Sequence, residues 1–172
     1  MTPDYWAKQE VGMAHGPDKY AALQPESYPM IDAIVRLAQP DWLLLDLGCN
    51  QGRHLKALRE LGLDVIGVDV KPFDDPAILC DTFERFLPRQ PKGMYELVFT
   101  FGMTIELVPY TFPICQELAR VARKALVLCI QETGIPYPRA WINEIEACGM
   151  QLTHYDQPVI QGSNANLLVF ER

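Results

Sequence analysis

The stretch LLLDLGCNQGRHLKALRELGLDVIGVD, residues 43–69, decides the fold of this chain. It begins with a leucine-rich run, passes through a turn with two glycines, continues as an amphipathic segment and ends in a second apolar run closed by an acid. Short apolar runs are typical of strands buried on both faces of a parallel sheet, and the segment between them has helical spacing. The stretch therefore predicts one βαβ unit, from which nucleotide-binding sheets are built.

The turn between the first strand and the helix contains Gly48, Asn50 and Gly52. Glycine, and less often asparagine, tolerates a positive φ, which a backbone needs where it bends sharply beside a ligand. The helix that follows presents free N–H groups and a positive dipole end to an anion over the strand end. Asp69 closes the second strand, where a carboxylate accepts hydrogen bonds from both hydroxyls of a ribose. We therefore expect an adenosine-containing ligand.

The spacing of the glycines separates two classes of adenosine ligand. Dinucleotide sites use Gly-x-Gly-x-x-Gly, whereas this turn reads Gly-x-x-x-Gly after Asp46. The segment instead resembles motif I of the class I S-adenosylmethionine-dependent methyltransferases, acid-x-Gly-x-Gly-x-Gly. Asp46, Gly48 and Gly52 match this motif, and Asn50 replaces its middle glycine with a residue that can take the same backbone conformation.

The resemblance extends over the chain from about Met30 and implies further contacts with the cofactor, S-adenosyl-L-methionine. It places the acid that accepts from the adenine amino group after a strand at 77–80, and the backbone that lines the methionine part at the end of a strand at 95–101. The cofactor-binding residues expected from the resemblance and the βαβ unit are Asp46, Gly48, Cys49, Asn50, Gly52, Asp69, Val70, Asp81, Thr82, Phe101 and Gly102.

The rest of the chain continues to alternate strands and helices. Further strands are predicted at 125–131, 150–154 and 166–170, with helices after residue 30, after an N-cap at Thr111, and over 141–148. This alternation predicts an α/β fold with a parallel sheet and right-handed crossovers. The resemblance implies a Rossmann-like, doubly wound, mostly parallel seven-stranded sheet with helices on both faces and a C-terminal antiparallel hairpin.

Length and composition agree with one α/β domain, because 172 residues can bury a substantial core but leave no room for a second. A net charge of −7 argues against a nucleic-acid substrate and favours a small or moderately sized acceptor. The five cysteines contain no Cys-x-x-Cys pair, so we expect neither a disulfide framework nor a metal site. No apolar run approaches a membrane span and the first residues lack signal-peptide features, so we expect a cytoplasmic protein.

The resemblance implies transfer of a methyl group from the sulfonium of the cofactor to a nucleophilic atom by in-line displacement. The protein must align the two groups and exclude water, and it needs a general base only if the acceptor proton leaves early. Candidate catalytic residues are Glu106 and His15, with His154 a weaker one. For Glu106 the alternative is an exposed carboxylate at a helix start, and many relatives carry histidine at that position.

The first 29 residues contain several aromatic side chains among polar ones. In the resembling family this segment often folds over the cofactor as a lid, so we expect residues 1–29 to form a lid or cap and residues 30–172 to form the methyltransferase domain. The expected substrate-binding residues are Tyr5, Trp6 and Tyr20, beside His15. The alternative is that Tyr5 and Trp6 only pin the terminus to the sheet.

Three other functions stay open at this point. The chain could bind S-adenosylmethionine while being catalytically silent or partner-activated. It could also methylate a nucleic acid or a protein, although strand 95–101 is not followed by the Asn/Asp-Pro-Pro-aromatic sequence of many DNA amino-methylating enzymes. An NAD-binding oxidoreductase shares the βαβ unit, but the glycine spacing disfavours it.

Overall fold

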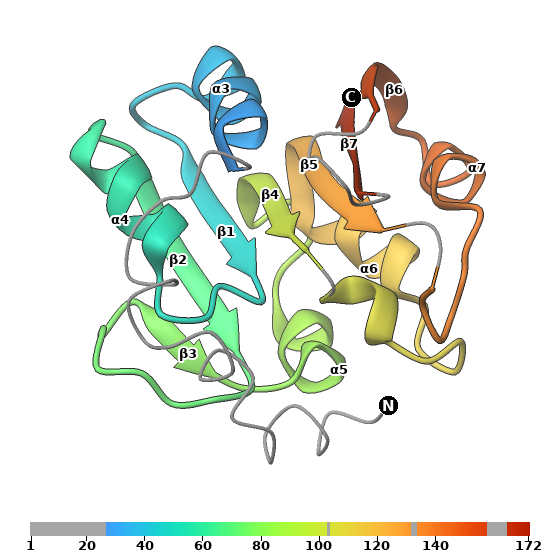
Figure 1. The fold of residues 1–172 in the computed structure, drawn as a ribbon, viewed down its shortest axis with the longest axis horizontal. Coiled ribbons are helices and arrows are strands. Elements are labelled where there is room, and N and C mark those ends of the chain that lie inside the picture. Colours follow the sequence, from blue (N-terminus) through green and yellow to red (C-terminus); the bar gives the residue numbers. More distant parts are fainter. Residues whose placement is uncertain (1–26, 103, 132–133, 158–164) are drawn as a thin grey trace.

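A seven-stranded sheet forms the middle of the molecule, with β3 and β6 at its two edges (Figure 1). The structure is a computed structural model, and it describes residues 27–102, 104–131, 134–157 and 165–172. In chain order the strands are β1 (Leu43–Leu47), β2 (Asp64–Asp69), β3 (Ile78–Cys80), β4 (Tyr95–Phe101), β5 (Ala122–Gln131), β6 (Gln151–Asp156) and β7 (Ala165–Glu171).

The strand order is β3-β2-β1-β4-β5-β7-β6. Strands β1 to β5 pair in parallel, and β7 pairs antiparallel with both β5 and β6. The seven strands and the C-terminal antiparallel hairpin confirm the predicted fold class. The chain runs outward from β1 to β3 and then returns to β4 on the other side of β1. Ligands of such sheets bind at the carboxyl ends of the strands where the order reverses, here β1 and β4.

Helices cover both faces of the sheet, as predicted. They are α3 (Tyr28–Leu37), α4 (Arg53–Glu60), α5 (Phe83–Phe86), α6 (Ile114–Val121) and α7 (Trp141–Glu146), with short 3-10 turns η2 (Leu87–Arg89) and η3 (Ile105–Leu107). Leu44 packs in the apolar core beneath α3 and α4, whereas its neighbour Leu45 packs in the core beneath α6 and α7. This alternation makes β1 apolar on both faces. None of the helices in the described residues is long and apolar enough to cross a membrane.

Several predicted boundaries differ from those in the structure: α7 ends at Glu146 rather than at residue 148, β6 covers Gln151–Asp156 rather than 150–154, and two further differences have a clear cause. The N-cap of α6 is Pro113 rather than Thr111, because the Phe112 N–H donates to the Pro109 carbonyl in a separate turn before the helix starts. Strand β5 begins at Ala122 rather than at residue 125, because the chain leaves α6 directly into a pairing with Tyr95. Neither difference moves the carboxyl ends of the strands.

Candidate functional site

The turn between β1 and α4 has the conformation that its residue types predict. Gly48, Asn50 and Gly52 have φ values of 78°, 50° and 78°. Among the described residues, Asn50 is the one non-glycine residue with a positive φ. Its Oδ1 accepts from the Gln51 N–H at 2.8 Å. Asn50 thus takes a left-handed conformation in place of the middle glycine of the resembling motif.

Gly48 also has a steric reason to be glycine. A Cβ atom at this position would lie 2.3 Å from Cγ2 of Thr104, in the loop after β4. The Thr104 hydroxyl contacts that of Thr100, which donates to the Leu47 carbonyl at 2.8 Å. The loops that follow β1 and β4 are therefore packed against each other at the point where the strand order reverses.

Cys49 is a packing residue of this turn. Its side chain is buried and lies over Gly67 of β2, where an added Cβ would be 2.5 Å from the Cys49 Sγ. Burial raises the pKa of the Cys49 thiol, so it stays protonated and is a poor nucleophile. A ligand at the turn would meet the Cys49 backbone rather than its sulfur.

Asp69 joins the end of β2 to the turn. Its Oδ2 accepts from the Asn50 N–H at 2.9 Å, and its Oδ1 accepts from the Lys71 N–H at 3.1 Å. Burial raises the pKa of Asp69 while these two hydrogen bonds oppose the rise. Each carboxylate oxygen has two lone pairs, so Asp69 can hold the turn and still accept two more hydrogen bonds. Val70 follows, and its carbonyl accepts from the Cys80 thiol at 3.5 Å.

Asp81 lies beside Asp69, because the Asp81 N–H donates to the Asp69 carbonyl at 2.9 Å. Its carboxylate forms ion pairs with Arg85, at 3.4 Å, and with Arg89, and accepts from the Thr82 N–H at 2.9 Å. The predicted adenine-binding acid is thus at the expected strand end, and its side chain is already held by two arginines. An incoming amino group would compete with them.

Phe101 ends β4 opposite the first turn of α4, and Gly102 follows it. The Phe101 ring meets the His54 ring edge-to-face, with centroids 5.2 Å apart, and the Arg53 guanidinium lies 5.5 Å from the Phe101 centroid. Gly102 has a φ of 82°, and apart from its two chain neighbours no atom of the described residues lies within 4 Å of a Cβ built there. The described residues therefore leave space beside Gly102, at the edge of the predicted methionine pocket.

Asp46 is buried, and the described residues do not satisfy its carboxylate. The residue is 1% exposed, and neither carboxylate oxygen has a hydrogen-bond partner among the described residues. The Nδ1 atom of His54 lies 3.6 Å from Oδ2, which is ion-pair range but too long for a hydrogen bond. His54 is itself buried, and its Nε2 lies 3.0 Å from the Ser27 Oγ. Burial raises the pKa of Asp46, and His54 and Arg53 oppose the rise.

Ser27 and His54 were not predicted from the sequence as part of the site. The available signal was the position of His54, which shares the buried side of α4 with Leu55 and Leu58. A histidine on an otherwise apolar helix side needs polar partners. Its partners lie far away in the sequence, and no local spacing reveals them.

Glu106, the predicted catalytic residue, is completely buried. Its Oε2 accepts from the Thr104 N–H at 3.0 Å and its Oε1 accepts from the Gln131 N–H at 2.7 Å. Burial raises its pKa to about 7. The Glu106 side chain ties the loop after β4 to the end of β5, so in this arrangement it faces backbone amides rather than a solvent-accessible cavity.

The other predicted residues with acid–base or aromatic side chains lie elsewhere. His154 is exposed on the edge strand β6, far along the sheet order from β1 and β4. Tyr5, Trp6, His15 and Tyr20 lie outside the described residues. The structure brings together at one sheet edge the predicted cofactor residues from the ends of β1, β2, β3 and β4.

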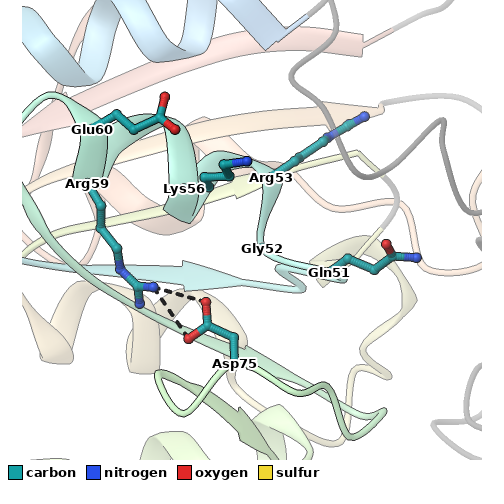
Figure 2. Close-up of a pocket in the computed structure, with 7 residues that line it drawn as sticks. All are labelled: Gln51, Gly52, Arg53, Lys56, Arg59, Glu60 and Asp75. Atoms are coloured by element: carbon teal, nitrogen blue, oxygen red, sulfur yellow. Dashed lines mark hydrogen bonds and ion pairs between the residues drawn. The ribbon is translucent and has the colours of Figure 1, made fainter.

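A basic hollow of about 370 Å³ lies beside α4 (Figure 2). It is lined by Gln51, Gly52, Arg53, Lys56, Arg59, Glu60 and Asp75. Within it Arg59 pairs with Asp75 at 3.0 Å, and the Arg53 side chain points away from that pair (Figure 2). The hollow shares only Gly52 with the predicted cofactor contacts, so it lies next to the predicted cofactor site rather than in it.

Comparison with solved structures places the fold among methyltransferases. Magnesium protoporphyrin IX methyltransferase from Synechocystis PCC 6803 with bound SAM matches with a TM-score of 0.76 at 15% identity, covering 99% of this chain and 94% of that one. The Burkholderia thailandensis 1,6-didemethyltoxoflavin-N1-methyltransferase, with 1,6-didemethyltoxoflavin and S-adenosylhomocysteine bound, matches with a TM-score of 0.74 at 12% identity, covering 100% and 91%.

A third match is a chain of a Haloferax volcanii complex between the Trm112 methyltransferase activator and a methyltransferase. Its TM-score is 0.68 at 14% identity, with coverage of 98% of this chain and 94% of that one. No protein-family model and no curated protein matches the sequence. The chain therefore has the fold of S-adenosylmethionine-dependent methyltransferases, as the sequence resemblance predicts.

Proposed function

We propose that this chain is an S-adenosylmethionine-dependent methyltransferase that methylates a small or moderately sized acceptor. One observation carries the proposal: three left-handed residues, Gly48, Asn50 and Gly52, form the turn after β1, and Asp69 at the end of β2 holds that turn through the Asn50 N–H. The arrangement combines a close-approach turn with a carboxylate at the ribose position.

The residues at the strand ends fit the cofactor. Asp69 retains lone pairs for the two ribose hydroxyls, and Asp81 lies at the next strand end for the adenine amino group. Asp46 has two carboxylate oxygens without a hydrogen-bond partner among the described residues, which suit the ammonium of the methionine part. The described residues leave space beside Gly102 for that part of the ligand. These features support S-adenosyl-L-methionine as the cofactor, as do the neighbours solved with SAM or S-adenosylhomocysteine.

When bound, the cofactor supplies an activated methyl group on a sulfonium. The protein contributes alignment and the exclusion of water. The packed loops after β1 and β4 provide a rigid wall for this purpose, because Thr104 fills the space beside Gly48. Among the described residues no exposed acid or histidine lies at this wall as an obvious general base, which favours an acceptor whose proton leaves late or a base from the N-terminal segment.

We further propose that residues 1–29 form a lid in which Tyr5, Trp6, His15 and Tyr20 line the acceptor pocket. The test is tryptophan fluorescence during titration with S-adenosylhomocysteine. We expect the ligand to change the emission of the wild type and the change to shrink in Trp6→Phe, with Trp42→Phe as the matched control. An equal response in wild type and Trp6→Phe contradicts the lid.

A catalytically silent or partner-activated protein is the second candidate. Two observations favour it: Glu106 is buried and fully engaged with backbone amides, and one structural neighbour is a chain of a complex with a methyltransferase activator. Methyl transfer by the isolated chain to any acceptor in a small-molecule panel excludes this candidate.

Calorimetric titration with S-adenosylmethionine, S-adenosylhomocysteine and NAD tests the proposed cofactor. We expect the first two to bind in about the micromolar range and NAD not to bind. Asp69→Ala should weaken binding by about tenfold or more, since a charge-assisted hydrogen bond is worth on the order of 1.5–3 kcal/mol. Asp64→Ala, at the exposed start of the same strand, is the control. Binding of NAD alone, or of none of the three, contradicts the proposal.

A further inference from the structure

Three buried polar side chains from distant parts of the sequence form a row behind the cofactor turn. Ser27, His54 and Asp46 are 0%, 4% and 1% exposed. The Ser27 Oγ lies 3.0 Å from Nε2 of His54, and Nδ1 of His54 lies 3.6 Å from Oδ2 of Asp46. The row links the start of α3 to β1 through the first turn of α4.

The Ser27 hydroxyl contacts His54 and does not cap its own helix. It stands at the N-cap of α3, where a serine hydroxyl normally accepts from a free N–H of the first helical turn, but its side chain makes no such bond. The hydroxyl is instead committed to His54. When Ser27 donates to Nε2, the proton of the neutral imidazole is on Nδ1, which faces Asp46.

The other sides of the His54 ring are also restrained. The Phe101 ring, at the end of β4, meets it edge-to-face at 5.2 Å. His54 is thus held by α3, β1 and β4, which meet at the predicted methionine pocket. Two further charged groups face Asp46: Arg53 favours the charged form of Asp46, and Asp69 is a like charge whose pKa Asp46 raises.

A buried carboxylate without hydrogen bonds is costly, so its retention calls for a partner that the described residues do not supply. His54 is close enough to attract the carboxylate but too far away to satisfy it. We propose that His54, oriented by Ser27, is a positioning residue that holds Asp46 ready for the ammonium group of the cofactor's amino-acid part. This inference rests on the proposed function. It assigns to Ser27 and His54 a role in recognising the amino-acid part of the cofactor and none in recognising its adenosine.

The experiment compares two ligands that differ at that end. S-adenosylhomocysteine carries the amino-acid part, whereas methylthioadenosine has the same adenosine and sulfur without it. Two variants separate the two contacts of the ring: His54→Asn keeps an N–H donor near the Nδ1 position, and His54→Gln reaches toward Ser27 but removes that donor. His154→Gln, on the exposed strand β6, is the control.

We expect His54→Gln to weaken S-adenosylhomocysteine binding by about tenfold, the scale of one charge-assisted hydrogen bond, and to leave methylthioadenosine binding unchanged. His54→Asn should restore most of the lost affinity, and Ser27→Ala should cause a smaller loss than His54→Gln, again for S-adenosylhomocysteine alone. Unchanged methylthioadenosine affinity also shows that each variant is folded.

Equal losses for both ligands, or full S-adenosylhomocysteine affinity in His54→Gln, would overturn the inference while leaving the proposed function standing. Failure of the wild type to bind either ligand would instead overturn the proposed function, and this inference with it.

Discussion

Asp46 and Glu106 are two buried carboxyl groups at the same edge of one sheet, and they differ in the hydrogen bonds that they accept. Glu106 accepts two backbone hydrogen bonds, from Thr104 and Gln131. Asp46 accepts none from the described residues, although it is 1% exposed. Burial raises the pKa of both groups.

The difference indicates which carboxylate serves the fold and which serves a ligand. A buried carboxylate is tolerated when hydrogen bonds replace its lost hydration, and Glu106 meets this condition within the protein. Asp46 does not meet it until another group arrives. The sequence analysis expected a catalytic role for Glu106 and a cofactor role for Asp46, and the hydrogen bonds favour the second expectation over the first.

The largest expected effect tests the structural role of Glu106. Glu106→Ala leaves two buried backbone N–H groups without acceptors, so we expect the free energy of unfolding to fall by about 4 kcal/mol. Urea denaturation measures this, with Glu60→Ala on the exposed surface of α4 as the control. A loss below about 1 kcal/mol would mean that the two hydrogen bonds contribute little.

The next effect compares the glycines that lie near the two carboxylates. Gly48 and Gly102 have φ values of 78° and 82°, but among the described residues an added Cβ would meet a neighbour, Thr104, only at Gly48. We expect Gly48→Ala to cost about 3 kcal/mol of unfolding free energy and Gly102→Ala about 1 kcal/mol, the cost of the left-handed backbone alone. Similar losses in both variants would show that the loops after β1 and β4 are not tightly packed.

The smallest effect is a pH dependence of stability. Because the folded-state pKa of Glu106 is raised from 4.5 to about 7, its contribution to stability is fully present below pH 4.5 and is lost as the pH rises through 7. Between pH 5.5 and pH 8 this amounts to about 2 kcal/mol. The stability difference between the wild type and Glu106→Gln should therefore shrink as the pH rises over this range. A difference that is constant or grows would contradict the raised pKa.

The backbone features of the fold and site were predictable because they depend on local residue types. The glycines and Asn50 of the turn, the apolar strands and Asp69 at a strand end each follow from spacing and conformational preference. The state of the side chains was not predictable. One of the two hydrogen bonds that Glu106 accepts comes from Gln131, 25 residues away. The hydrogen-bond partner of His54 is Ser27, 27 residues away. Such contacts form only when whole helices and strands pack together, so local sequence patterns do not predict them.

The central claim is that Asp46, which lacks hydrogen bonds among the described residues, belongs to the cofactor site, and that Glu106, which accepts two, does not. The direct test is calorimetric titration of Asp46→Asn and Glu106→Gln with S-adenosylhomocysteine, beside the wild type. The account predicts that Asp46→Asn loses about tenfold or more in affinity while Glu106→Gln stays within about threefold of the wild type. Full affinity in Asp46→Asn, or a larger loss in Glu106→Gln, would contradict it.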